Sequence, residues 1–268
     1  MLDVLQFDFM QNALAAGLLA SLICGIIGSL VVVNRIVFIS GGIAHASYGG
    51  VGLAFFLGLP VLPVTTAFTL AAALVMAAVT LHARERADTV IGVLWAAGMA
   101  LGIILLDITP GYNVDLMSYL FGSILAVPQG DLWGMAILAC IIFGLIIAFY
   151  RGFLVMSFDE EFARSRGVPV DFLYFLLIAM VGLSVVMIIR VVGLILVIAL
   201  LTIPPFMAER RTTSLGAMMA VASVLSALFT VSGLLLSYYA DITSGAAIIA
   251  VATTCFFFSL LLPGKKMV

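Results

Sequence analysis

Long apolar stretches alternate with short polar links from one end of the chain to the other. A helix needs about 20 mostly apolar residues to cross a bilayer, and most of these stretches approach that length. We therefore expect an all-α membrane protein with about nine transmembrane helices, or alternatively eight. The expected crossings cover residues 12–33, 39–59, 64–81, 89–106, 132–150, 172–189, 192–207, 215–238 and 244–262.

Two shorter apolar stretches depart from this series. Leu116–Val127 is too short to span a bilayer, so we expect a re-entrant or outer helix there. The stretch 192–207 is also short, and we expect Pro204-Pro205 to break its end, because proline lacks the N–H that a helix uses.

The longest polar link, Arg151–Asp171, predicts a short amphipathic helix. Ser157 is a candidate N-cap, and Gly167 is a candidate end. Acidic residues would fall in the first turn and arginines later, which suits the helix dipole. These first-turn acids are Asp159, Glu160 and Glu161.

Phe158 and Phe162 are spaced one helical turn apart in this link, and they would form a small apolar knob on a charged helix. Such a helix suits docking onto a soluble partner. The alternative is a helix that lies flat on the lipid surface, although mixed charge is poorly suited to anionic lipid.

Composition agrees with this pattern. The chain has 268 residues, of which 65% are hydrophobic and 9% are charged, whereas soluble domains are about 25% charged. No polar segment is long enough to fold as a separate soluble domain. We therefore expect residues 1–268 to form a single transmembrane domain.

The positions of the basic residues predict the orientation, because Lys and Arg stay on the cytoplasmic side of short loops. With the N-terminus outside and the C-terminus cytoplasmic, every Lys and Arg except Arg190 lies inside. Three outer aspartates then flank Leu116–Val127, where they would contribute to an outer gate or a docking surface, or would only solubilise the loops. They are Asp107, Asp115 and Asp131.

His45 is the one histidine within an apolar stretch, Ser40–Gly52. In a helix it would share a stripe with glycines and one tyrosine, so the imidazole would face a tight interface or a narrow cavity. The other members of that stripe are Gly41, Gly42, Tyr48, Gly49 and Gly52. An ionisable group at membrane depth usually has a function, but His45 could also serve packing alone.

Several classes of function are excluded by missing motifs. The chain has no G-x-x-x-x-G-K-[ST], no H-E-x-x-H, no G-x-S-x-G and no dinucleotide fingerprint. Basic residues are too few and too scattered for nucleic acid binding. We expect a protein that is not an enzyme and holds no stable cofactor.

Four segments together resemble the membrane subunits of bacterial zinc, manganese or iron ABC importers. They are residues 35–52, 113–123, 158–167 and 192–205. Related importers of iron-siderophores and vitamins carry E-E-x-A-x-x-x-G on the cytoplasmic helix that touches the ATPase, and here it is formed by Glu160, Glu161, Ala163 and Gly167. One departure is Gly41, because many family members have an aspartate four residues before the histidine.

This resemblance implies a homodimer in a bacterial or archaeal plasma membrane, with ABC ATPase subunits inside and a metal-binding protein outside. ATP would bind to the partner, and a zinc, manganese or iron ion would pass His45 as cargo. Two other classes stay open on the residues alone. One is a secondary metal transporter driven by protons or sodium, and the other is a membrane scaffold without transport activity.

Overall fold

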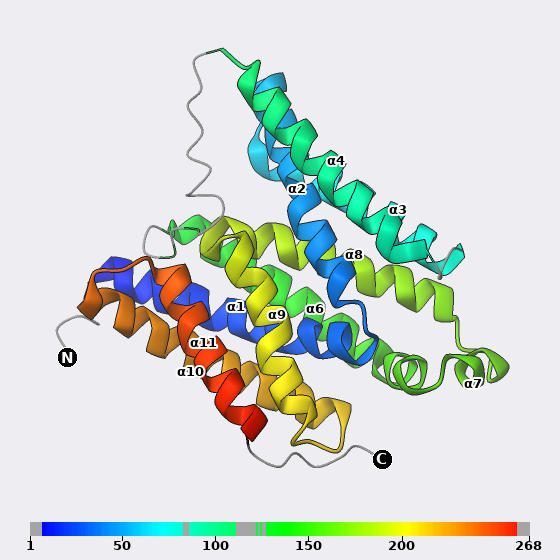
Figure 1. The fold of residues 1–268 in the computed structure, drawn as a ribbon. Helices are drawn as coiled ribbons and strands as arrows, with labels where there is room; N and C mark the ends of the chain where they lie inside the picture. The colour runs from blue at the N-terminus through cyan, green and yellow to red at the C-terminus, as the bar shows by residue number, and fades with distance from the viewer. Residues whose placement is uncertain (1–6, 83–85, 111–121, 123, 125–126, 262–268) are drawn as a thin grey trace. The chain divides into compact units, whose positions relative to one another are not determined.

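The computed structural model describes residues 7–82, 86–110, 122, 124 and 127–261, and within them every regular element is a helix (Figure 1). The helices are α1 (Asp8–Val33), α2 (Val37–Leu57), α3 (Val61–His82), α4 (Ala87–Asp107), α6 (Gln129–Phe158), α7 (Glu160–Ser165), α8 (Val170–Val192), α9 (Leu194–Glu209), α10 (Leu215–Ala240) and α11 (Ser244–Leu261).

Among the described residues, 7 helices are long and apolar enough to cross a membrane, namely α1, α3, α4, α6, α8, α10 and α11. The prediction of an all-α membrane protein is confirmed. The remaining two expected crossings correspond to α2, with 21 residues, and α9, with 16 residues. The count of nine stays a prediction, and most of the expected helix Leu116–Val127 lies outside the described residues.

The chain divides into two compact units, and α6 and α8 each contribute to both. The first unit consists of residues 1–34, 117–150 and 187–268, and the second consists of residues 35–116 and 151–186. In the first unit, α1 packs on α9 and α10, and α11 packs on the same two helices. In the second unit, α2 packs on α3 and α4. That the whole chain acts as one domain stays a prediction.

Glycines bring α2 and α4 into backbone contact in the second unit. A Cβ atom added to Gly52 would lie 2.4 Å from the carbonyl oxygen of Gly102, and one added to Gly98 would lie 2.7 Å from the Cα of Ala46. Side chains cannot occupy such spaces, so small residues set the distance between these helices. Gly98 and Gly102 form the G-x-x-x-G spacing typical of close membrane helix pairs.

The proline pair lies inside α9, which continues to Glu209, so the prediction that Pro204-Pro205 breaks the helix is wrong. A proline in a helix leaves the carbonyl four residues earlier without its usual donor. For Pro205 that carbonyl belongs to Leu201, and its oxygen lies 2.6 Å from where a Cβ of Gly28 would be. Both prolines are buried. Helix α1 therefore packs directly against this part of α9, and the helix continues through both prolines, as membrane helices can where a neighbouring helix packs on them.

The polar link also differs from the expectation. Helix α6 runs on to Phe158, which places Ser157 inside it, and α7 begins after Asp159. Asp159 is the N-cap, because its carboxylate accepts a 2.8 Å hydrogen bond from the backbone N–H of Phe162. Ser157 is therefore not the cap, and Phe158 and Phe162 lie on two different helices.

Candidate transport site and coupling helix

His45 lies in the middle of α2 and is partly buried. Its ring nitrogen Nδ1 is 2.8 Å from the carbonyl oxygen of Gly41. A carbonyl can only accept, so Nδ1 carries the proton in this hydrogen bond and Nε2 keeps its lone pair. Metal-binding histidines commonly donate one ring N–H to a backbone carbonyl in this manner. Nε2 is thus the atom through which His45 can bind a metal ion.

The imidazole of His45 stacks on the indole of Trp95, which comes from α4. The ring centroids are 4.0 Å apart and the ring planes differ by 28°. The indole N–H of Trp95 donates to the sulfur of Met99 at 3.3 Å. Trp95 could not be predicted as a partner of His45, because the residues of one apolar stretch do not show which residues of another helix they contact.

The expected glycine stripe divides into two groups. Gly42, Gly49 and Gly52 pack tightly, because a Cβ on any of them would lie less than 3 Å from an atom of α3 or α4. Gly41 is different, since a Cβ there would have no neighbouring atom within 4 Å. The tight interface is therefore the α2–α4 contact, and the space for another side chain lies beside Gly41, one turn from His45.

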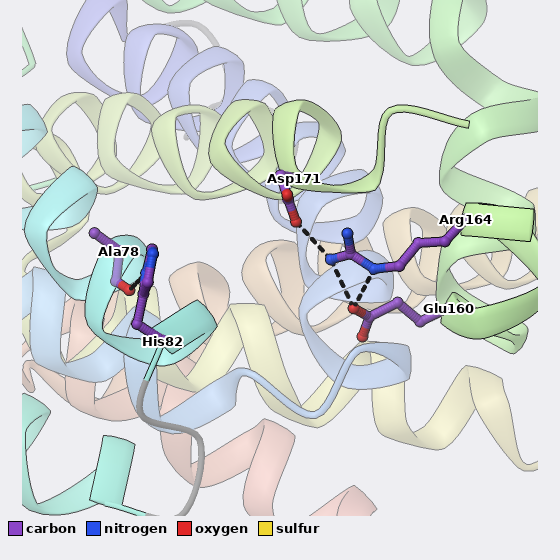
Figure 2. Close-up of polar contacts among 5 residues, drawn as sticks. All are labelled: Ala78, His82, Glu160, Arg164 and Asp171. Carbon is purple, nitrogen blue, oxygen red and sulfur yellow. Dashed lines mark hydrogen bonds and ion pairs between the residues drawn. The ribbon is translucent and has the colours of Figure 1, made fainter. Parts of the chain in front are cut away.

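No group of three or more His, Cys, Asp or Glu side chains able to hold a metal ion is present among the residues that the structure describes. The other histidine, His82, is exposed at the end of α3, and its Nδ1 donates to the carbonyl of Ala78 at 2.7 Å (Figure 2). The two histidines thus make the same local hydrogen bond, but only His45 lies inside an apolar helix.

The polar link between α6 and α8 contains α7, a helix of 6 residues with charged ends. Glu160 and Glu161 lie in its first turn and Arg164 in its last, as the dipole favours. Phe162 is 51% exposed, and Phe158, at the end of α6, is 61% exposed. Ala163 is fully buried. Two large aromatic side chains therefore face outward in the most polar part of the chain.

Gly167 ends this segment with a backbone that favours glycine. Its φ is +76°, and its N–H donates to the carbonyl of Arg164 while that of Val168 donates to Ala163. This pair of hydrogen bonds is a Schellman motif, which commonly ends a helix with glycine. The predicted role of Gly167 as a helix end is confirmed.

Arg164 connects α7 to α8. Its guanidinium donates to Glu160 at 3.0 Å, one turn earlier in α7, and to the carboxylate of Asp171 in the first turn of α8 (Figure 2). The hydrogen bond to Asp171, followed by that to Glu160, raises the pKa of Arg164 above its ordinary value. Arg164 therefore keeps its charge at any physiological pH.

The three aspartates predicted to lie on the outer side differ in their surroundings. Asp131, in the first turn of α6, forms an ion pair of 3.3 Å with Arg190, in the last turn of α8. Arg190 is the one basic residue that the predicted orientation does not place on the cytoplasmic side, and the carboxylate of Asp131 lies beside it. Asp107 is exposed at the end of α4. Asp115 lies outside the described residues.

These features define a helical membrane transport subunit, with an imidazole inside one apolar helix and a short charged helix outside the apolar spans. Comparison with known proteins gives the family, because residues 6–263 match the ABC 3 transport family. The chain belongs to this family. It is the membrane subunit of a metal ABC transporter, a permease and not an enzyme, as the sequence predicted.

Individual relatives and a solved structure match nearly the whole chain. The chain is 35% identical over 263 residues to the manganese transport system membrane protein MntC of Listeria monocytogenes, covering 98% of this chain and 94% of that protein. It is 50% identical over 260 residues to an uncharacterized membrane protein of Synechocystis sp., covering 97% and 92% of the two chains. Among solved structures, it is similar to a chain of PsaBC from Streptococcus pneumoniae in complex with Fab, with a TM-score of 0.88, 32% identity and coverage of 98% and 95%.

Proposed function

We propose that this chain forms the translocation path of an ATP-driven importer for divalent metal ions, and that His45 is a transient stopping place for the ion. The observation that supports this most directly is the imidazole of His45, whose Nδ1 is bonded to Gly41 while Nε2 is left to bind a metal. A lone imidazole is a weak ligand set. A weak site suits transport, because a complete tetrahedral cage would hold the ion too tightly to release it.

Manganese is the metal that we propose first, with zinc and iron as the alternatives. The Listeria relative is named as part of a manganese transport system. Imidazole binds all three metals to differing degrees, so the histidine alone does not select among them.

The ion path in this proposal is formed by a homodimer. One His45 from each protomer would give two imidazoles near the symmetry axis, which is a more plausible stopping place than one. A symmetric dimer brings identical residues together in this way. Zero, one or two histidines can then bind the ion as it moves.

Energy for transport comes from ABC ATPase subunits on the cytoplasmic side. Helix α7 supports this part of the proposal, because the exposed rings of Phe158 and Phe162 offer an apolar contact to a soluble partner. The charges of Glu160 and Glu161 would orient the contact more than strengthen it.

On the outer side, we propose that a metal-binding protein docks near Asp107, Asp115 and Asp131. The N-terminus then lies outside and the C-terminus in the cytoplasm of a bacterial or archaeal cell, in its plasma membrane. In this orientation Arg190 is the one basic residue on the outer side, and the ion pair with Asp131 would compensate its charge. It also leaves less free negative charge at Asp131 than at Asp107.

The test is metal uptake by vesicles that contain the chain and its ATPase partner, compared for manganese, zinc and iron. We expect uptake of manganese that requires ATP hydrolysis and an external binding protein. Uptake that proceeds at the same rate without ATP, driven by a proton or sodium gradient, would overturn the proposal and favour a secondary transporter.

A further inference from the structure

We propose that Trp95 is a positioning residue for His45, and that its indole fixes the plane of the imidazole so that Nε2 is presented to the metal ion. This inference rests on the proposed role of His45. Trp95 does not bind the ion in this account. It acts through the histidine.

Two contacts fix the orientation of the imidazole of His45. The hydrogen bond from Nδ1 to Gly41 fixes one atom of the imidazole, but the ring can still tilt about that contact. Stacking on Trp95, with centroids 4.0 Å apart and planes at 28°, removes this freedom. The two contacts together determine the direction of Nε2.

The indole is itself held in place. Its N–H donates to the sulfur of Met99 one turn later in α4, and Phe38 of α2 lies against its ring with centroids 6.1 Å apart. The backbone of α4 cannot move closer to α2, because Gly98 and Gly102 already contact α2 directly. Trp95 is therefore a fixed surface and not a mobile side chain.

The second step concerns the number of ligands. Position 41, one turn before His45, is a glycine and offers no side-chain ligand. Here each protomer offers only the imidazole from this helix turn. A site with few ligands depends more on each being preorganised, because an ordering cost at any one of them is a larger share of a small binding free energy.

The third step concerns charge. An imidazole that binds a divalent cation loses electron density, and the face of an indole carries a negative quadrupole that stabilises a neighbouring positive group. The stacked indole thus stabilises the metal-bound form of His45 more than the free form. An aliphatic side chain at position 95 could fill space but could not do this.

The experiment uses the full chain purified with its ATPase partner, and Mn²⁺ alone is the probe. The chain has 2 tryptophans, so Trp133→Phe leaves Trp95 as the only indole when the ATPase partner is a variant with its tryptophans replaced. We expect paramagnetic Mn²⁺ to quench its fluorescence saturably, and His45→Ala to remove the saturable component. In parallel, Trp95→Leu and Trp95→Phe are compared for Mn²⁺ affinity by the electron paramagnetic resonance of free Mn²⁺.

We expect Trp95→Leu to weaken Mn²⁺ binding by about tenfold or more, as loss of a group that orients a metal ligand typically does, and Trp95→Phe to restore most of it. Trp133→Leu is the matched control and should leave the affinity unchanged. The chain has 2 histidines. When only this chain is labelled with ¹⁵N-histidine and is then combined with unlabelled ATPase partner, spectra of the His82→Gln variant report His45 alone. Trp95→Leu should shift its ring nitrogen signals and mix its tautomers.

Two results separate the possible failures. In the first case, His45→Ala abolishes Mn²⁺ binding, but Trp95→Leu either binds Mn²⁺ as the wild type does or binds it less tightly with unchanged His45 signals. The positioning role of Trp95 is then wrong, and the proposed function stands. If His45→Ala itself binds Mn²⁺ normally, the metal site of the proposed function is wrong, whatever Trp95 does. Thermal unfolding of each variant identifies any variant that fails to fold. If Trp95→Leu fails to fold, the Mn²⁺ affinity of Trp95→Phe decides whether an aromatic ring at position 95 is required.

Discussion

Arg164 donates a hydrogen bond to Asp171, so α7 is held to the start of α8 by a side-chain contact as well as by the intervening chain. In the Glu160–Arg164–Asp171 network, Arg164 and Asp171 are exposed to solvent and Glu160 is partly exposed. Exposed ion pairs contribute little to stability, because water and salt screen them. The network therefore sets the orientation of α7 relative to α8 and adds little to stability.

From this we predict that Arg164→Ala is mild, with uptake within about fivefold of the wild type, whereas Phe162→Ala uncouples ATP hydrolysis from transport. A buried aromatic anchor can contribute about 2 kcal/mol or more to an interface, and the ring of Phe162 is available to become one. The assay is ATPase co-purification together with vesicle uptake. Phe258→Ala is the matched control, because this ring is also exposed but lies on an apolar span. Equal loss in Arg164→Ala and Phe162→Ala would contradict this division of roles.

The second prediction concerns the exit from α7. Gly167→Val should uncouple transport, because a β-branched residue is strained at the φ of +76° found there. Gly167→Asn is the control, since asparagine tolerates this conformation. No atom lies within 4 Å of a Cβ at this position, so any difference between the variants reports backbone geometry and not a clash. Full transport by Gly167→Val would show that the exit geometry is unimportant.

A third prediction tests the α2–α4 contact. Gly52→Ala should lower the unfolding temperature in detergent, because the added Cβ would meet the backbone of Gly102 at 2.4 Å. Gly144→Ala, in α6, has open space and should be neutral or stabilising, since alanine favours a helix over glycine by about 0.5–1 kcal/mol. If the two variants unfold at the same temperature, glycine packing does not set the distance between these helices.

The fourth prediction uses the space beside Gly41. Gly41→Asp fits without a clash and would place a carboxylate one turn from His45. We expect tighter Mn²⁺ binding and slower release, so that affinity rises while the maximal uptake rate falls. Gly41→Asn has nearly the same shape without the charge, and it should change both quantities less. Identical Mn²⁺ affinity in the two variants would show that the carboxylate does not reach the ion.

The apolar pattern predicts most helices within a few residues, because burial in lipid requires long apolar runs whatever the tertiary structure. It fails where local and tertiary effects compete. Ser157 and Asp159 are both good N-caps, and only the structure shows that α6 continues past the serine. Pro204-Pro205 predicts a break, and only the structure shows that both prolines lie inside α9, packed against α1.

For the candidate site, the sequence predicts His45, and this stays a prediction, but the surroundings of His45 could not be predicted from the sequence. Trp95 lies in another helix, and nothing in its own stretch marks it as a partner of the histidine. The pairing of Asp131 with Arg190 is likewise a contact between helices. One feature of the sequence does indicate a contact between helices, because the G-x-x-x-G spacing of Gly98 and Gly102 predicts a close partner for α4.

The central claim, that His45 lies on the ion path, is tested most directly by ATP-dependent Mn²⁺ uptake in vesicles that contain His45→Ala. His82→Ala is the matched control, because His82 makes the same hydrogen bond to the carbonyl four residues earlier. We predict that His45→Ala abolishes uptake while membrane insertion and ATPase association stay intact, and that His82→Ala transports normally. Normal uptake by His45→Ala would contradict the account and leave His45 as a packing residue.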